Sequence, residues 1–116
     1  MKSGTVTERG YSSSYVNFVI KQIQRLTPAT IKILFTLANG PKYTRQLAGI
    51  IRSLDITTVL NDLERLGLIE RKESTLKDFL GPKYPPIPIV VNYLTPKGEY
   101  VLTHLRQLAE LLEYES

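Results

Sequence analysis

Residues 55–71 read DITTVLNDLERLGLIER, and the hydrophobic period changes within this stretch. Its first part carries apolar residues at the spacing of an amphipathic helix, at Ile56, Val59, Leu60, Leu63 and Leu66. Gly67 follows as a helix C-cap, because glycine readily adopts the left-handed conformation that ends many helices. From Leu68 onward, apolar and charged residues alternate as in a half-buried strand. The stretch therefore predicts a helix that leads directly into a strand.

Three further helices are predicted upstream. Apolar residues at helical spacing indicate the first over residues 12–26, where the leading serines offer an N-cap. Residues 27–28, Thr-Pro, start the second, because threonine caps a helix and proline is tolerated at its first position. The expected buried stripe of this second helix is Ile31, Leu34, Phe35 and Leu37. After an extended link at residues 42–43, Thr44 is expected to cap the third helix, and a turn at residues 52–55 follows.

A hairpin and a last helix are predicted downstream. The segment 87–94, IPIVVNYL, is β-branched and alternating, so it is expected to pair with the strand that starts at Leu68. The proline-rich segment 81–86 interrupts these strands and makes the hairpin a wing with a long tip. Residues 95–96, Thr-Pro, then open the last helix. Its heptad-like seam is Val101, Leu105, Leu108 and Leu112.

This order of elements predicts a mainly α fold with a small β-hairpin (α+β), a winged helix-turn-helix with extra N- and C-terminal helices. With 116 residues the chain has the size of one domain with a single small core. Residues 1–11 are expected to form a flexible arm and residues 12–116 the domain. Within it, 27–95 is the winged-helix core, and 12–26 and 96–114 are the expected dimerisation helices.

Three segments in this order also carry a family resemblance. TRQLAGII (44–51) is placed as the helix before a recognition helix, and YLTPKGEYVL (93–102) as a return strand and the start of a dimerisation helix. Between them, LERLGLI (63–69) has the form Leu-Glu-x-x-Gly-Leu-Ile. Together they resemble MarR-like and related archaeal and bacterial winged-helix regulators over about residues 27–112. The resemblance implies a dimeric, DNA-binding transcriptional regulator.

The helix at residues 55–66 is expected to enter the DNA major groove, with its outer face against base edges. The outward residues are Thr57, Thr58, Asn61, Asp62 and Arg65. Asn61 can contact adenine with both amide atoms, and the threonines can contact a thymine methyl or a phosphate. The alternative is an ordinary polar surface, in which Arg65 pairs with Asp62 or Glu64.

Flanking basic and polar residues are expected to contact the DNA backbone. Thr44, Arg45 and Gln46 start a helix, where free N–H groups favour a phosphate, and Arg45 is the expected clamp. Thr44 has the alternative of being only a cap. The wing is expected to reach the backbone or the minor groove through Arg71, Lys72, Lys77 and Lys83. The alternative for the wing is a solvated hairpin, because acidic residues dilute its charge.

The apolar stripes of the terminal helices exceed what a small core needs to cover. These residues are Tyr15, Phe18, Val19, Ile23, Val101, Leu105, Leu108 and Leu112. A homodimer formed through them would place two recognition helices about one DNA turn apart, roughly 34 Å. The alternative is that the two terminal helices pack on one another within one chain.

Composition excludes several classes of function. The chain has no cysteine and one histidine, so disulfides, thiolate chemistry and a histidine-rich metal site are not expected. The sequence contains no glycine-rich phosphate loop and no nucleophile at a recognisable distance from a base, so we expect neither an enzyme nor a cofactor. No stretch approaches the roughly 20 apolar residues of a membrane span, and we expect a cytoplasmic protein.

Charge permits nucleic-acid binding without requiring it. The net charge is +4, with five basic residues against one acidic in 1–40, eight against six in 41–83, and two against four in 84–116. Two other functions stay open: a winged helix used for protein interaction, since fold alone does not settle function, and a weakly selective architectural DNA-binding protein. No residue identifies a small-molecule effector.

Overall fold

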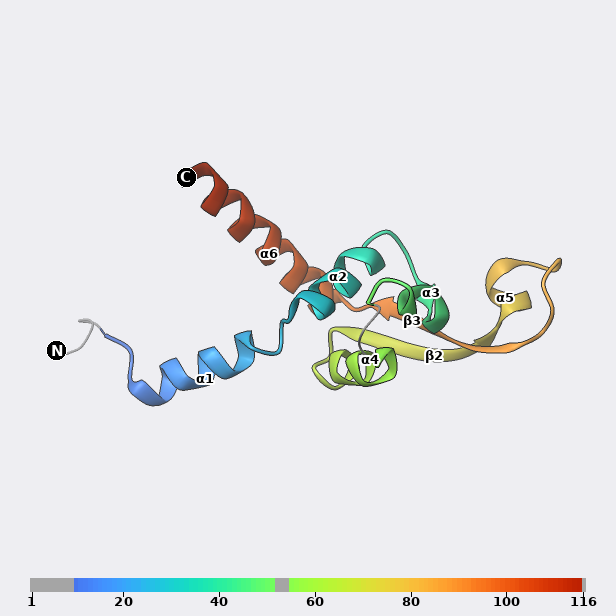
Figure 1. Ribbon diagram of the computed structural model, residues 1–116, viewed down its shortest axis with the longest axis horizontal. Coiled ribbons are helices and arrows are strands. Elements are labelled where there is room, and N and C mark those ends of the chain that lie inside the picture. Colours follow the sequence, from blue (N-terminus) through green and yellow to red (C-terminus); the bar gives the residue numbers. More distant parts are fainter. Residues whose placement is uncertain (1–9, 52–54, 116) are drawn as a thin grey trace.

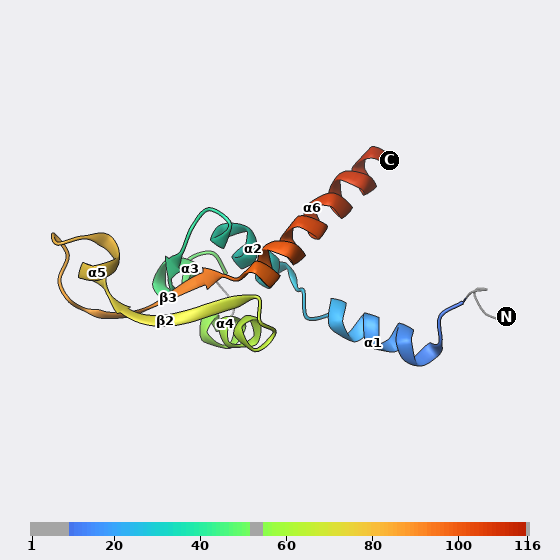
Figure 2. The same cartoon turned by 180° about the vertical axis from the view of Figure 1, so that it is seen from behind.

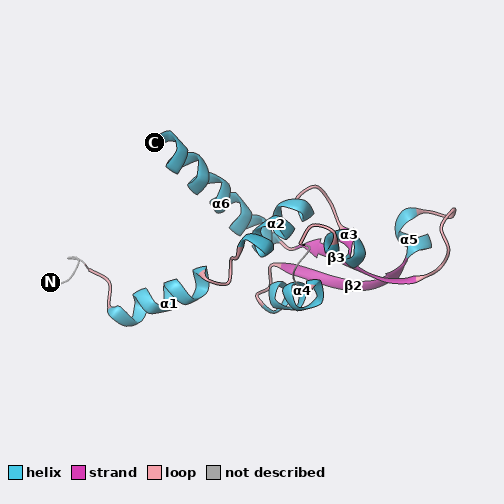
Figure 3. Ribbon diagram, in the orientation of Figure 1, coloured by secondary structure: helices cyan, strands magenta, loops and turns pink. Residues whose placement is uncertain are grey.

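The computed structural model describes residues 10–51 and 55–115, with side chains as far as Glu113. The helices are α1 (Ser13–Ile23), α2 (Pro28–Leu37), α3 (Thr44–Ala48), α4 (Ile56–Arg65), α5 (Leu76–Leu80) and α6 (Pro96–Glu115). The strands are β1 (Lys42–Tyr43), β2 (Ile69–Thr75) and β3 (Pro88–Leu94). Figure 1 shows α2, α3, α4 and the sheet gathered in one body, with the wing at one end and α1 and α6 at the other. The mainly helical fold with a small sheet confirms the predicted winged helix-turn-helix (Figure 3).

The helices begin at the polar residues that the sequence predicts, with one exception. Ser12 and Thr27 accept hydrogen bonds from the N–H groups of Tyr15 and Thr30, at 3.1 and 3.3 Å, and thereby cap α1 and α2. The prediction that Thr44 caps α3 is wrong. The N-cap of α3 is Tyr43, whose strand β1 runs directly into the helix, and Thr44 is the first helical residue.

Helix α4 has a well-defined start and end. Asp55 caps its start by accepting from the N–H of Thr57 at 3.0 Å. At its end Gly67 has a φ of +79°, which glycine adopts without steric cost. The N–H groups of Gly67 and Leu68 then donate to the carbonyls of Glu64 and Leu63 at 2.9 and 3.0 Å, the Schellman pattern of helix termination. The predicted turn before α4 falls mainly on residues 52–54, outside the described residues.

The core lies between α2, α3, α4, the base of the sheet and the first turns of α6. Its residues are Ile33, Leu34, Leu37, Leu47, Leu60, Leu63, Leu68, Ile69 and Leu102. The predicted stripe of α2 is wrong at one position, because Phe35 is exposed and Ile33 is fully buried in its place. The two other apolar residues of α4, Ile56 and Val59, pack at the edge of this core.

The three strands form one antiparallel sheet in the order β1-β3-β2. The predicted hairpin is present, with Ile69 opposite Leu94 and Thr75 opposite Pro88. The link at residues 42–43 is a strand in its own right and pairs with Asn92 and Val91. The hairpin tip also contains a helix that the sequence pattern did not predict, the single turn of α5, capped by Thr75.

The two terminal helices project from the body and diverge from each other. Figures 1 and 2 show α1 and the outer half of α6 well separated. No residue of α1 is buried. Beyond Leu102, no described residue of α6 is buried. The packing of these helices on one another, considered above as an alternative, is therefore not what the structure shows.

Candidate nucleic-acid interface

The outer face of α4 carries the polar residues that the sequence predicts there. Thr57, Thr58, Asn61, Asp62 and Arg65 are all exposed. The opposite face holds Leu60 and Leu63, both fully buried. The helix is thus fixed to the core along one side and presents hydrogen-bonding groups along the other. Contacts between this face and DNA stay a prediction.

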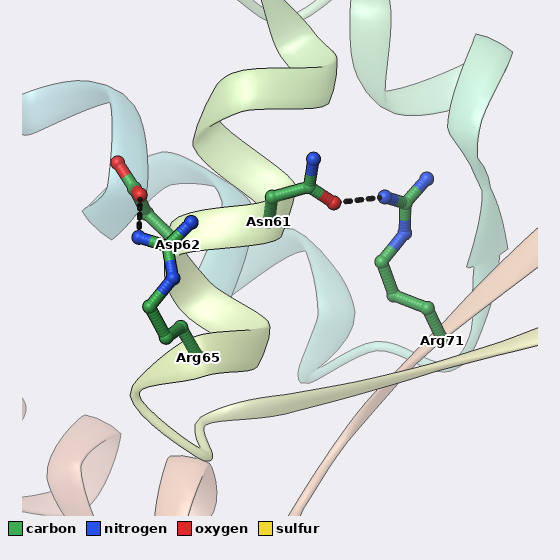
Figure 4. A network of polar contacts seen from close by, with 4 residues as sticks. All are labelled: Asn61, Asp62, Arg65 and Arg71. Carbon is green, nitrogen blue, oxygen red and sulfur yellow. Dashed lines mark hydrogen bonds and ion pairs between the residues drawn. The ribbon is translucent and has the colours of Figure 1, made fainter.

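Several groups on this face already have partners at its two ends. The hydroxyl of Thr58 donates to Asp55 at 2.9 Å. Arg65 pairs with Asp62 at 2.7 Å, and both side chains are largely exposed (Figure 4). An exposed pair of this kind contributes at most about 1 kcal/mol to stability and can be exchanged for another anion. Arg65 therefore forms the ion pair with Asp62 that the sequence offered as the alternative to a DNA contact.

Arg71 joins helix α4 to the sheet. It lies on β2 directly opposite Asn92 on β3. Its Nε donates to the Asn92 Oδ1 at 2.9 Å, its Nη1 to the Asn61 Oδ1 at 2.8 Å and its Nη2 to the Thr44 hydroxyl at 3.1 Å. Figure 4 shows the side chains of Asn61 and Arg71 meeting from α4 and β2. Arg71 was predicted as a wing residue, but its guanidinium points to the helices and not to the wing tip.

Asn92 is a polar residue of this site that was not predicted from the sequence. It is fully buried. Its Nδ2 donates to the Lys42 carbonyl at 3.1 Å and to the Thr44 hydroxyl at 3.4 Å. A signal existed, since an asparagine within the apolar run IPIVVNYL must find partners when buried. Asn92 therefore fixes β1, β3 and the Arg71 side chain in one arrangement.

The start of α3 combines structural and exposed groups. The Thr44 hydroxyl donates to the Val90 carbonyl at 3.3 Å, so its first role is to tie α3 to β3. The Gln46 Oε1 accepts from the backbone N–H of Tyr43 at 3.0 Å, as in a capping box. Arg45 is exposed. Of the three residues predicted here, Arg45 is the one whose side chain makes no hydrogen bond or ion pair among the described residues.

The wing lysines face solvent on different elements. Lys72 alternates with Arg71 on β2, and its Nζ lies 3.7 Å from Glu70 and 5.5 Å from the ring centre of Tyr93. Lys77 is an exposed residue of α5, and Lys83 lies on the exposed tip that follows. Phe79 of α5 contacts Tyr43 edge to face, with ring centres 6.1 Å apart, so the wing is braced against β1.

The end of α4 is also bonded to the start of α6. Thr95 donates through its hydroxyl to the Gly67 carbonyl at 2.6 Å, and Lys97 donates to the Leu66 carbonyl at 2.8 Å. These carbonyls lie at the negative end of the α4 dipole, where a lysine is favourable. The orientation of the recognition helix is thereby coupled to the helix that projects from the body.

A helix-turn-helix pair, α3 and α4, followed by a β-hairpin wing defines a winged helix-turn-helix protein. No protein-family model matches the sequence, and no curated protein does. Solved structures do match over most of the chain. Each of the three that follow is provisionally described as a transcriptional regulator.

A MarR-family protein from Porphyromonas gingivalis W83 is 27% identical, with a TM-score of 0.59 over 79% of this chain and 85% of that one. A MarR-family protein from Enterococcus faecalis V583 is 20% identical, with a TM-score of 0.65 over 90% and 87%. The protein ytfH from Salmonella typhimurium is 23% identical, with a TM-score of 0.57 over 83% and 81%. The resemblance to MarR-like regulators inferred from the sequence motifs is thus confirmed at the level of structure.

Two features are absent from the described residues, a cluster of metal-ligating side chains and a helix that could span a membrane. These residues contain no group of three or more histidine, cysteine or acidic residues placed to hold a metal ion. Within the same residues, no helix combines the length and apolar character that crossing a membrane requires.

Proposed function

We propose that the protein is a homodimeric transcriptional regulator that binds double-stranded DNA sequence-specifically. The observation that carries the proposal is the exposed polar face of α4, held above two fully buried leucines on a winged helix-turn-helix fold. A helix of this kind fits the major groove, where each base pair presents a distinct pattern of donors and acceptors. The MarR-family descriptions of similar structures support the same function.

Base contacts and backbone contacts fall to different residues in this proposal. Asn61, Thr57 and Thr58 read base edges from α4, with Arg65 at the groove margin. Arg45 contacts a phosphate, and the lysines of the wing follow the backbone or the minor groove. Arg71, Thr44 and Gln46 position these groups, because their side chains are hydrogen-bonded to neighbouring elements.

The exposed apolar faces of the terminal helices support the proposed dimerisation. Tyr15, Phe18 and Ile23 on α1 are at least half exposed, and so are Leu108 and Leu112 on α6. An isolated helix as short as α1 is marginal in water, so it requires a packing partner that the described chain does not provide. A second copy supplies the same apolar faces and gives the two-fold symmetry that a palindromic operator requires.

Fluorescence anisotropy with labelled random duplexes at several salt concentrations tests the proposal. Binding that weakens steeply with salt is expected, followed by enrichment of a palindromic site from a duplex library. Asn61→Ala should reduce selectivity, whereas Arg45→Ala should weaken binding to all sequences alike. Lys32→Ala, which removes an exposed cation from α2, is the matched control and should change neither. Absence of binding at low salt would favour a protein-interaction module. Binding without enrichment of any sequence from the duplex library would favour an architectural DNA-binding protein.

A further inference from the structure

The Asn61 amide on the outer face of α4 is held in one orientation by Arg71. A guanidinium has only donors, so it can face only the oxygen of an amide. The Arg71 Nη1 lies 2.8 Å from the Asn61 Oδ1. Figure 4 shows the Asn61 nitrogen directed away from the guanidinium. Within the described residues, no hydrogen bond engages that nitrogen, so the exposed end of Asn61 is a donor.

Arg71 is itself fixed from three sides. Its other hydrogen bonds go to Asn92, which is fully buried, and to Thr44, which is bonded to β3. The stem of Arg71 rises from β2 on the same face as Ile69, which is nearly fully buried. Rotation of the Asn61 amide would therefore break a charge-assisted bond to a side chain that cannot easily follow it.

Bases differ in what they offer to such a donor. An adenine contact with both amide atoms needs the oxygen to accept from N6 while the nitrogen donates to N7. Guanine presents two acceptors, N7 and O6, and no donor at this edge of the major groove. Arg71 takes one lone pair of the amide oxygen and holds that oxygen toward β2, while the amide nitrogen points away from the guanidinium. The pair Asn61–Arg71 therefore presents mainly donors, which fit the two acceptors of guanine better than the acceptor and donor of adenine.

We propose that Arg71 is a specificity-determining residue, which holds Asn61 as a hydrogen-bond donor so that the recognition helix selects guanine over adenine. The inference rests on the proposed DNA-binding function and refines it. It replaces the sequence-based expectation that Asn61 pairs with adenine. Arg71 acts here mainly through Asn61 and is a positioning residue.

Selection from a randomised duplex library, with the full chain, tests the inference. The wild-type protein is expected to require guanine at one position of each half-site, and Asn61→Ala should remove the preference at that position alone. Arg71→Met frees the amide, so adenine should become accepted there, with the ratio of guanine to adenine falling at least about fivefold. A purely structural role for Arg71 would weaken binding to all sequences and leave that ratio unchanged, which would overturn the inference.

Asn61→Asp provides a second test that does not depend on the stability of the Arg71 variant. Asn61 is exposed, so the replacement should fold. The carboxylate keeps its bond to Arg71 and presents an acceptor, so preference should move from guanine to cytosine, whose N4 amino group donates. Retention of guanine would overturn the inference. Glu73→Gln, two residues further along β2, is the matched control and should leave the base preference unchanged.

The outcomes separate this inference from the function on which it rests. If the wild-type protein binds no duplex at low salt, the proposed function fails, and the inference with it. If it binds and selects adenine at the position that Asn61→Ala affects, the proposed function stands and the inference alone is wrong.

Discussion

Asn92 shows how one buried polar residue organises the surface around it. It lies at the centre of the sheet, opposite Lys42 on one side and Arg71 on the other. Its amide oxygen accepts from Arg71, while its nitrogen donates to β1 and to Thr44. A buried amide is costly unless its hydrogen bonds are made, and here they are made to groups that position the recognition helix.

Asn92→Ala is therefore expected to reduce the free energy of unfolding by about 2 kcal/mol, since it leaves the buried end of this network without partners. Chemical denaturation followed by circular dichroism measures the change. Asn39→Ala removes an exposed asparagine at the end of α2 and should change stability by no more than about 0.5 kcal/mol. Equal effects of the two substitutions would contradict a special role for Asn92.

Gly98 marks a close approach between α6 and the start of β2. A Cβ atom at this position would overlap the carbonyl oxygen of Leu68 and lie 2.7 Å from the Leu94 Cδ1. Gly98→Ala should therefore lower the free energy of unfolding by about 1 to 3 kcal/mol, despite the better helix propensity of alanine. Gly49→Ala, where an added Cβ meets nothing within 4 Å, is the control and should be neutral or slightly stabilising in thermal unfolding.

Single residues were predicted from the sequence where local pattern decides their position. Strand alternation places Arg71 on the face of Ile69, so its direction toward the helices could have been read from β2 alone. Its partners could not, because Asn61, Asn92 and Thr44 are distant in sequence and meet only through strand pairing and helix packing. The orientation of the Asn61 amide depends on these long-range contacts.

Among the elements, α4 and the wing are held in place by different kinds of contact. Helix α4 has an N-cap and ends in a Schellman motif, and a side-chain hydrogen bond from Lys97 connects its C-terminal end to α6. The wing extends beyond the core, and the contact between Phe79 and Tyr43 braces it against β1. A rigid helix suits base readout, and a solvated wing with exposed lysines suits backbone contact.

Lys77→Gln and Lys83→Gln test the wing at this scale. Each should weaken binding to specific and random duplexes by a similar factor, because phosphate contacts carry no sequence information. The slope of log affinity against log salt should fall by about one for each phosphate that the variant no longer neutralises. Lys32→Gln on α2 serves as the charge-matched control. A change in base preference, or an unchanged salt slope, would count against backbone contact by these lysines.

Elements with an apolar stripe were predicted well, and those without one were not. The stripes and caps located α1, α2, α4 and α6 to within a few residues. Strand β1 was expected only as an extended link, because its pairing with β3 spans some fifty residues of sequence. Helix α5 has five residues, so its apolar residues Leu76, Phe79 and Leu80 cover little more than one turn and make no sustained stripe. A second local signal is Thr75 followed by Asp78, a capping spacing next to the proline-rich tip.

At the scale of the whole molecule, the chain is elongated, with principal extents of 65 × 30 × 27 Å. The wing and the projecting helices lie at opposite ends of the longest axis, with α4 between them (Figure 1). Charge is divided along the sequence in a similar way. The first two-thirds of the chain has an excess of basic residues, and the last third, which contains α6, has an excess of acidic residues. An acidic α6 is compatible with the proposed dimer, in which this helix stays away from phosphates.

Phe18→Glu combined with Leu108→Glu tests the dimer on which this arrangement depends. Both side chains are more than half exposed in the single chain, so the double variant should keep its fold and its thermal unfolding. Buried in a dimer, the added carboxylates would be costly, so light scattering after size exclusion should show a dimer for the wild type and a monomer for the variant. Affinity for a full palindrome should fall at least about tenfold, because the second half-site no longer benefits from its linkage to the first. Affinity for an isolated half-site should change little.

Phe35→Glu, at an exposed aromatic of α2 outside both terminal helices, is the matched control and should remain dimeric. A variant that stays dimeric, or a wild type that is monomeric at the concentrations of DNA binding, would exclude dimerisation through α1 and α6.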